Sequence, residues 1–175
     1  MKQLKPGFAL MLRTCDKDLK SYGGFQWPQK GLVTAPDWKP TPECGNGLHG
    51  LLWGEGNGSL LNWKSDAAWL AVLVKESSVV QIAGKIKVSR GYVVRCGDRK
   101  SVTDFIAANG GQGKAICGYQ ATAGYSGTAT AGYGGIIKIR WYDGMRSRIA
   151  IGYVGENGIE PNVPYVVKDG KLWKK

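Results

Sequence analysis

Acidic residues and histidine are scarce in this chain, and its cysteines lack the spacing of a metal knuckle. The 175 residues hold 13 Asp and Glu against 24 Lys and Arg, with one histidine, so the formal net charge is +11. This imbalance argues against nucleic-acid mimicry and favours an acidic partner. The four cysteines form no Cys-x-x-Cys pair, which excludes a zinc ribbon and a thioredoxin-type redox pair. We expect reduced, buried thiols.

Long apolar runs are also missing. The stretch at 7–12 is apolar but ends at Arg13, which makes it too short for the core of a secretory signal or for a membrane span. We therefore expect a protein that is made in the cytosol and not secreted, with no membrane partner. Because the chain also lacks a complete set of metal ligands or a cofactor motif, we expect neither a metal nor a cofactor.

Glycine and large aromatic residues are abundant. The chain has 27 Gly, seven Trp and eight Tyr, and its hydrophobic fraction is 43%. This apolar content is sufficient for a buried core, so general disorder is excluded, and the glycines favour turns and strands over a helical bundle. The sequence predicts a mainly β fold with one short helix. We expect a β-rich domain over 1–107, followed by a Gly-rich repeat and hairpins over 108–175.

Local patterns place the elements of the first domain. Runs rich in β-branched residues at 70–74, 79–83, 85–88 and 92–96 are separated by turn residues and predict strands. The segment 101–110 begins with Ser101 as a helix cap, carries Asp104 in its first turn and ends at Asn109-Gly110. These start and stop signals predict the one helix.

The segment 108–135 contains an eight-residue repeat. Gly124-Tyr-Ser-Gly-Thr-Ala-Thr-Ala131 is followed by a partial copy from Gly132 and preceded by a copy shortened by two residues. Both spacings are even, so in an extended chain one side carries the repeat tyrosines and alanines, which are Tyr119, Tyr125, Tyr133, Ala121, Ala123, Ala129 and Ala131. We expect a short β-solenoid-like repeat capped by a β-hairpin. The alternative is a flexible Gly-rich linker.

The segment 136–154 reads as a hairpin around Asp143-Gly144. With a two-residue turn, Trp141 would pair with Arg146 and cations would lie on both faces. A three-residue loop with Gly144 left-handed separates apolar from cationic residues better. Its inner face carries the pairs Trp141–Met145, Ile139–Ser147 and Ile137–Ile149. The outer face then carries two cation pairs, Arg140–Arg146 and Lys138–Arg148. We predict this second register and, with it, a basic patch.

Several motifs together suggest a relationship. They are Cys44-Gly-Asn-Gly-Leu-His49, the step Cys96-Gly-Asp-Arg99, the octads, and the closing run from Ile137 to Gly144 with Gly-Tyr-Val-Gly-Glu-Asn-Gly after it. Their combination resembles uncharacterised bacteriophage and prophage proteins that carry variable numbers of such octads. The resemblance covers nearly the whole chain and implies a phage origin and a repeat-bearing β architecture, but no catalytic residue.

The sequence contains no complete set of catalytic residues or metal ligands. Cys44 and His49 could share a zinc ion only with two further ligands from elsewhere, and no third member of a catalytic triad accompanies them. The glycine-rich stretch before His49, with Ser65-Asp-Ala-Ala-Trp, faintly resembles ADP-ribosyltransferases. In such an enzyme Glu156 or Glu160 would have to act as the catalytic glutamate, although neither has the flanking pattern of that family.

We therefore predict a non-enzymatic phage accessory or virion-associated protein that binds an acidic surface through basic β faces. The alternatives are an ADP-ribosyltransferase-like enzyme acting on a host target and a nucleic-acid-binding protein acting during infection. The expected partner is an acidic protein or a virion component, with nucleic acid as the second choice, in the host cytoplasm or the virion. The predicted binding residues are the clustered cations Lys138, Arg140, Arg146, Arg148, Lys85, Lys87, Arg90 and Arg95.

Overall fold

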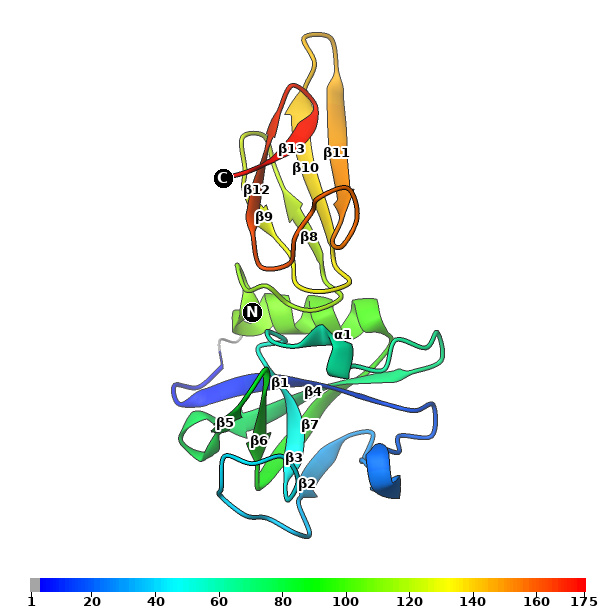
Figure 1. The fold of residues 1–175 in the computed structure, drawn as a ribbon, viewed down its shortest axis with the longest axis vertical. Coiled ribbons are helices and arrows are strands. Elements are labelled where there is room, and N and C mark those ends of the chain that lie inside the picture. The colour runs from blue at the N-terminus through cyan, green and yellow to red at the C-terminus, as the bar shows by residue number, and fades with distance from the viewer. Residues whose placement is uncertain (1–3) are drawn as a thin grey trace.

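The chain folds into two lobes stacked along its long axis, as seen in a computed structural model that describes residues 4–175 (Figure 1). Residues 1–3 of the expected first domain lie outside the described residues. The first lobe is a large sheet, the second consists of two small sheets, and the helix lies between them (Figure 1). The expectation of a mainly β fold is confirmed.

The first lobe is built on a seven-stranded antiparallel sheet with the order β2-β7-β4-β1-β3-β6-β5. Its strands are β1 (Phe8–Cys15), β2 (Gly31–Thr34), β3 (Leu48–Leu52), β4 (Ala68–Lys75), β5 (Val80–Ile82), β6 (Lys85–Val88) and β7 (Arg90–Gly97). The four strands expected between residues 70 and 96 are confirmed as β4 to β7. Short 3-10 turns lie at η1 (Tyr22–Gly24), η2 (Gly58–Leu60) and η3 (Glu76–Ser78).

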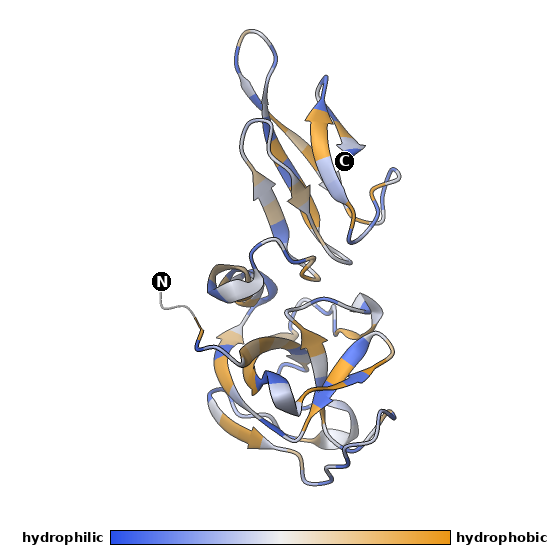
Figure 2. Cartoon of the chain, turned by 90° about the vertical axis from the view of Figure 1, so that its left-hand side faces the viewer, coloured by the Kyte–Doolittle hydropathy of each residue, from blue (hydrophilic) through white to orange (hydrophobic). Residues whose placement is uncertain are grey.

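Both faces of the sheet are covered at its central strands β1 and β4. In β1, Ala9 and Met11 belong to one buried cluster, while Leu10 and Leu12 belong to another on the opposite side. Successive side chains of a strand point to opposite faces, so a strand that is apolar throughout is a central layer. Figure 2 shows orange, hydrophobic stretches on strands of the first lobe, interrupted by blue segments.

The helix covers one face of this sheet. α1 (Arg99–Ile106) continues into a π-type turn, η4 (Ala107–Gly111), and buries Val102 and Ile106 against the sheet. The predicted helix is confirmed, but its cap is Asp98, whose Oδ1 accepts a hydrogen bond from the Ser101 N–H at 2.7 Å. None of the helices in residues 4–175 is long and apolar enough to span a membrane.

The second lobe packs two three-stranded sheets face to face, with the orders β11-β10-β8 and β13-β12-β9. Its strands are β8 (Gln120–Ala123), β9 (Ala129–Thr130), β10 (Ile136–Tyr142), β11 (Ser147–Tyr153), β12 (Pro164–Lys168) and β13 (Lys171–Lys174). Ile137, Ile139 and Tyr165 form its core together with small alanines.

The predicted solenoid-like repeat is wrong for the described residues. β8 pairs in parallel with β10, whereas β9 pairs antiparallel with β12, so successive octads enter different sheets and do not stack on one another. The repeat alanines do face the core, as Ala121, Ala129 and Ala131 are buried. Two of the three repeat tyrosines, Tyr125 and Tyr133, are instead about half exposed. The octad strands span four and two residues, and they gain pairing partners only from the hairpins that follow them.

The predicted register of the 136–154 hairpin is also wrong. A four-residue loop joins the strands, and Trp141 pairs with Arg148, Arg140 with Ile149 and Lys138 with Ile151. Ile137 and Ile139 face inward as expected, but on β11 the inward residues are Ala150 and Gly152. Packing against the second sheet explains why Ala150 and Gly152 face inward, because a Cβ at Gly152 would lie 2.5 Å from Leu172 of β13. Only small side chains fit there, so the isoleucines of β11 face outward.

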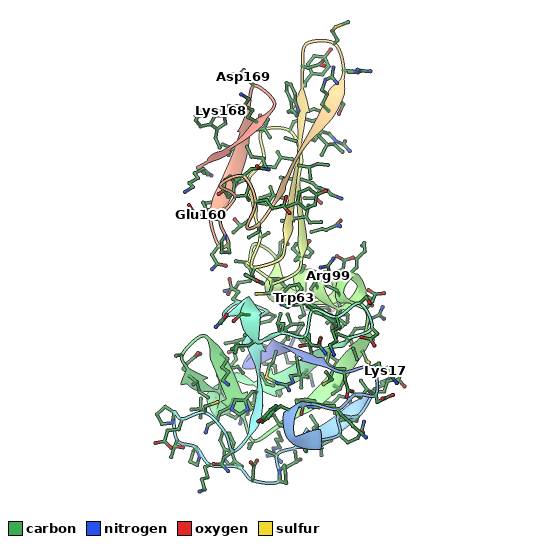
Figure 3. The ribbon with its side chains drawn as sticks, turned by 45° about the vertical axis from the view of Figure 1, so that its right-hand side comes forward. Lys17, Trp63, Arg99, Glu160, Lys168 and Asp169 are labelled. Carbon is green, nitrogen blue, oxygen red and sulfur yellow. The ribbon has the colours of Figure 1, made fainter. Side chains whose placement is uncertain are left out.

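The two lobes meet at an aromatic contact. The Trp63 ring lies 5.4 Å from Trp69 of β4 and 5.6 Å from Tyr133 of the octad segment, measured between ring centres. Figure 3 shows Trp63 and Arg99 at the junction. Gly134 (φ +63°) lies against the Trp63 ring, which a Cβ there would approach to 2.6 Å. Residues of the second half of the chain also enter the first lobe, because Ile116 and Cys117 belong to its buried cluster.

Candidate functional site

A cavity of about 550 Å³ opens on the first lobe. Its lining residues Trp27 and Leu48 belong to one buried cluster of the sheet, whereas Trp63 packs against the other. Its walls come from the loop before β2, the loop before β3, and the strands β1, β3 and β6. The side chains that matter below are Arg13, Trp27, Cys44, His49 and Lys85. A smaller space of about 100 Å³ borders Arg13, His49 and Lys85 as well.

Arg13 enters the cavity from β1. Its Nη1 donates to the His49 carbonyl oxygen at 3.2 Å, and its guanidinium carbon lies 5.6 Å from the centre of the Trp27 ring. Its Nε is buried and has no hydrogen-bond partner. A guanidinium stays charged in proteins and has donors only, so this nitrogen needs an acceptor.

His49 lies on β3 beside Arg13. Its Nε2 is buried without a partner. Burial, followed by the positive charges of Lys85, Arg13 and Lys87, lowers the pKa of His49 from 6.5 to about 4. The imidazole is therefore neutral at pH 7, and it adds a polar nitrogen to the cavity without adding charge.

Trp27 forms the apolar wall. Its side chain is only 2% exposed, and Phe25 packs edge-on against it with ring centres 5.8 Å apart. The indole Nε1, which can only donate, is buried and has no partner. Within residues 4–175, the buried side-chain nitrogens and oxygens without a hydrogen bond are those of Arg13, Trp27 and His49. All three residues line this one cavity.

Lys87 fixes the loop that closes the cavity. Its side chain is fully buried, and its Nζ donates to the Glu43 carbonyl oxygen at 2.9 Å and to the Gly45 carbonyl oxygen at 3.1 Å. The ammonium also lies 5.8 Å from the centre of the Trp38 ring. Lys87 was predicted as a surface cation, but its buried ammonium cannot reach a docking partner and serves instead to hold this loop.

Lys85 and Cys44 meet at the cavity. The Lys85 Nζ donates to the Cys44 Sγ at 3.0 Å. This hydrogen bond, the charge of Lys85 and the backbone N–H of Gly45 lower the pKa of the Cys44 thiol below its usual value of 9.0. Asp37 brings a negative charge to the same wall, and its Oδ2 accepts from Asn46 at 3.3 Å.

A metal is not supported by clustered ligands. Residues 4–175 contain no group of three His, Cys, Asp or Glu side chains placed to hold an ion. Cys44 and His49 do line one cavity, as the sequence analysis considered, but no further acidic or thiol ligand joins them there in a cluster.

The other predicted binding residues are dispersed. Arg95 donates to the Ser101 Oγ at 2.7 and 3.0 Å, and Arg90 is exposed at the start of β7. Lys138 donates to the Gln120 Oε1 at 3.2 Å, and Arg140 lies 5.9 Å from the Tyr125 ring centre. Arg148 lies on the opposite face of the hairpin and pairs with Asp143, while Arg146 lies in the loop. The four cations of the hairpin therefore do not form the single patch that the predicted register implied.

Arg13 and Trp27 were missed by the sequence analysis. Arg13 was considered only as the end of an apolar stretch, although an arginine that follows an apolar run of a central strand is a candidate for a buried, functional charge. Trp27 carries no local signal, because its burial depends on the loops that cover it.

The family and its relatives change the predicted origin of the chain. A family model described as a domain of unknown function, DUF7666, matches residues 9–108. An ice nucleation protein of Xanthomonas campestris pv. translucens is 41% identical over 102 residues, which cover 57% of this chain and 6% of the relative. One of Pseudomonas syringae is 38% identical over 102 residues (57% and 9%), and InaU of Pantoea ananas 37% over 105 residues (59% and 10%). The chain thus spans a tenth or less of the length of these relatives.

These findings correct the phage resemblance. The matched relatives are bacterial ice nucleation proteins, so the predicted bacteriophage family is wrong, and so is the function derived from it, a phage accessory or virion-associated protein that docks through basic faces. The relatives likewise give no support to the alternatives, an ADP-ribosyltransferase-like enzyme and a nucleic-acid-binding protein. No solved structure matches the chain. Because the family model covers more than half of its length, the chain belongs to the DUF7666 domain family.

Proposed function

We propose that the first lobe is a binding module for a small organic carboxylate, which enters the cavity lined by Arg13, Trp27 and His49. The observation that carries this proposal is a cavity that combines the positive charges of Arg13 and Lys85 with an aromatic wall. Three of its lining residues, Arg13, Trp27 and His49, each also hold a buried side-chain nitrogen without a partner. Buried polar groups in folded proteins nearly always have partners, and each one left without costs about 1–3 kcal/mol. Because these nitrogens have almost no accessible surface, a ligand recovers this free energy when the side chains around it rearrange to reach them.

The chemistry of these nitrogens selects an anion. Arg13 Nε and Trp27 Nε1 can only donate, so the ligand must bring acceptors. Arg13 and Lys85 add two positive charges, whereas Asp37 contributes one negative charge on the loop side. Hydrogen bonds between a guanidinium and a carboxylate are among the stronger ones in proteins. An oxyanion therefore fits the cavity better than a neutral or cationic ligand.

The apolar wall selects the rest of the ligand. Phe25, Trp27 and Leu48 line the cavity together with the polar residues Arg13, His49 and Lys85. A volume of about 550 Å³ lies within the range of pockets for small molecules, roughly 300–1,000 Å³. The expected ligand thus has an apolar or aromatic body beside its carboxylate. Ice nucleation, the activity named in the relatives, is not part of this proposal, because the chain covers only a small share of those proteins.

Benzoate and benzamide are suitable probes, because they have the same shape and differ in charge. Binding is measured by calorimetry and by thermal unfolding with the full chain and with two variants, Arg13→Met and the control Arg90→Met, which removes an exposed arginine outside the cavity. We expect benzoate to bind about tenfold or more tightly than benzamide. Loss of the Arg13 interaction should weaken benzoate binding by about 10- to 100-fold, since hydrogen bonds to charged groups contribute about 1.5–3 kcal/mol.

The control variant should bind benzoate as the unchanged chain does. Circular dichroism of Arg13→Met checks that the variant is folded before its affinity is compared. Equal affinity for benzoate and benzamide, absence of benzoate binding at millimolar concentration, or unchanged affinity in a folded Arg13→Met variant would each overturn the proposal.

A further inference from the structure

The four cysteines of the chain, all in its described part, differ sharply in environment. Cys15 and Cys117 are buried, and burial raises the pKa of each thiol to about 11. Cys96 is half-buried, and burial raises its pKa as well. Cys44 is exposed, and its neighbours lower its pKa. Since the thiolate is the nucleophile, Cys44 has the environment of a reactive cysteine and the other three serve as internal comparisons.

One buried lysine holds the chain on both sides of Cys44. The Lys87 Nζ binds the carbonyl oxygens of Glu43 and Gly45, which are the residues directly before and after the cysteine. Lys85, two residues earlier on β6, donates to the Cys44 Sγ itself at 3.0 Å. Neighbouring lysines of one strand thus fix the position of the sulfur and supply its counter-charge.

The cavity beside Cys44 points to a ligand independently of the cysteine. Trp27 is only 2% exposed and is one of the residues that line this cavity, and its buried indole N–H has no acceptor. Arg13 Nε and His49 Nε2 lack partners in the same place. These three residues line the same cavity as Cys44 and Lys85, so a ligand that draws their side chains to it would lie beside the Cys44 thiol.

We propose that Cys44 is a thiol-modification site that forms a mixed disulfide with small carboxylate-bearing disulfides entering this cavity. The proposal rests on the proposed function, because the cavity is what selects an anionic reagent. The Cys44 thiolate attacks one sulfur of the reagent, the new Sγ–S bond forms as the S–S bond of the reagent breaks, and the second half leaves as a thiolate that takes a proton from solvent. A thiol reductant reverses the step.

A pair of small disulfides tests this inference. Dithiodiglycolate carries two carboxylates, and 2-hydroxyethyl disulfide is similar in size and neutral. The fully reduced chain reacts with each, peptide mass mapping identifies the modified cysteine, and each rate is divided by the rate of the same reagent with a free small thiol. We expect Cys44 to be modified first, and its normalised rate to be about tenfold higher with dithiodiglycolate, because fixed positive charges concentrate an anion locally.

Three variants separate the contributions. Lys85→Met should slow the reaction of Cys44 about tenfold at pH 7 with both reagents, since an ordinary thiol is then only a few per cent ionised. Arg13→Met should remove the preference for the anionic reagent. Lys75→Met, which changes an exposed lysine at the end of β4, should alter neither rate.

The outcomes distinguish this inference from the proposed function. Modification of Cys96 as fast as Cys44, or no effect of Lys85→Met, overturns the inference. Fast modification of Cys44 without a preference for the anionic reagent also overturns it. Benzoate binding is measured in parallel with the unchanged chain and with a Cys44→Ser variant. If both bind benzoate but Cys44 of the unchanged chain is not modified, only the inference falls. If neither binds benzoate, the proposed function falls too.

Discussion

Lys87→Met should loosen the loop that closes the candidate cavity. The substitution keeps the length and the apolar stem of the side chain but removes its ammonium, which donates to the Glu43 and Gly45 carbonyl oxygens. The loop at 43–47 would then be held to β6 only by the Lys85–Cys44 contact and by packing. We expect lower stability and faster local opening of this loop.

The magnitude follows from the two hydrogen bonds. Each bond to a charged group contributes about 1.5–3 kcal/mol, so the pair contributes about 3–6 kcal/mol before offsets. Both offsets are substantial: Glu43 and Gly45 are exposed, so water replaces the lost donor, and the variant no longer buries a charge. We expect a net loss of about 2 kcal/mol in the free energy of unfolding. For a chain of this size that corresponds to a melting temperature about 4–8 °C lower.

Thermal unfolding and hydrogen exchange measure this effect. Lys85→Met is the matched control, because its ammonium contacts a sulfur at the surface and such contacts contribute less than about 1 kcal/mol. Amides at 43–47 should exchange faster in Lys87→Met than in the unchanged chain, and they should lose more protection than the amides of β4, whose loss is limited to the fall in the global free energy of unfolding. If Lys87→Met is as stable as Lys85→Met, and the amides at 43–47 are equally protected in the two variants, then Lys87 does not hold this loop in place and the reasoning is refuted.

Two further predictions concern His49 and the junction of the lobes. The pKa of His49 falls from 6.5 to about 4 on folding, so the stability that this residue contributes is complete above pH 6.5 and is lost as the pH falls toward 4. His49→Gln should therefore make the free energy of unfolding less dependent on pH between 6.5 and 4 than it is in the unchanged chain. Gly134→Ala should destabilise the chain by about 1–3 kcal/mol, since its Cβ would lie 2.6 Å from the Trp63 ring. The control Gly144→Ala is also at positive φ but has open space around it, so it should cost about 1 kcal/mol. Equal melting temperatures of the two variants would contradict this account.

Features set by neighbouring residues were predictable from the sequence. The alternation and β-branched content of β4 to β7 located these strands, and the start and stop signals located the helix, although Asp98 rather than Ser101 caps it. The even spacing of the octads predicted that Ala121 and Ala129 point the same way, and both are buried in the core of the second lobe. Each of these features depends on periodicity within one segment.

Features set by distant partners were not predictable. The hairpin register was chosen by sorting isoleucines inward, but the space beside Gly152 is filled by Leu172 from 20 positions further along the chain. Asp143 also stabilises a longer loop than expected, because its Oδ1 accepts from the backbone N–H groups of Met145 and Arg146 at 2.8 Å each. The Asp143 hydrogen bonds are local, but Leu172 lies outside 136–154, so no pattern within that segment indicates that Gly152 must face inward.

The candidate site shows the same division. Cys44 and His49 could be singled out because they are the cysteine and histidine closest to each other in the sequence, and both line the cavity. The burial of Lys87 could not be foreseen, because it depends on an irregular, proline-containing loop that folds over β6.

The contact at Trp63 has a consequence for chains that share only part of this architecture. Gly58 and Trp63 lie within the family match at 9–108, whereas Tyr133 and Gly134, which cover them, lie beyond it. A homologue that joins the same first lobe to an unrelated C-terminal region must either supply a different cover for this indole or replace it with a hydrophilic residue. The residue at the position of Trp63 should therefore vary together with whatever follows the domain.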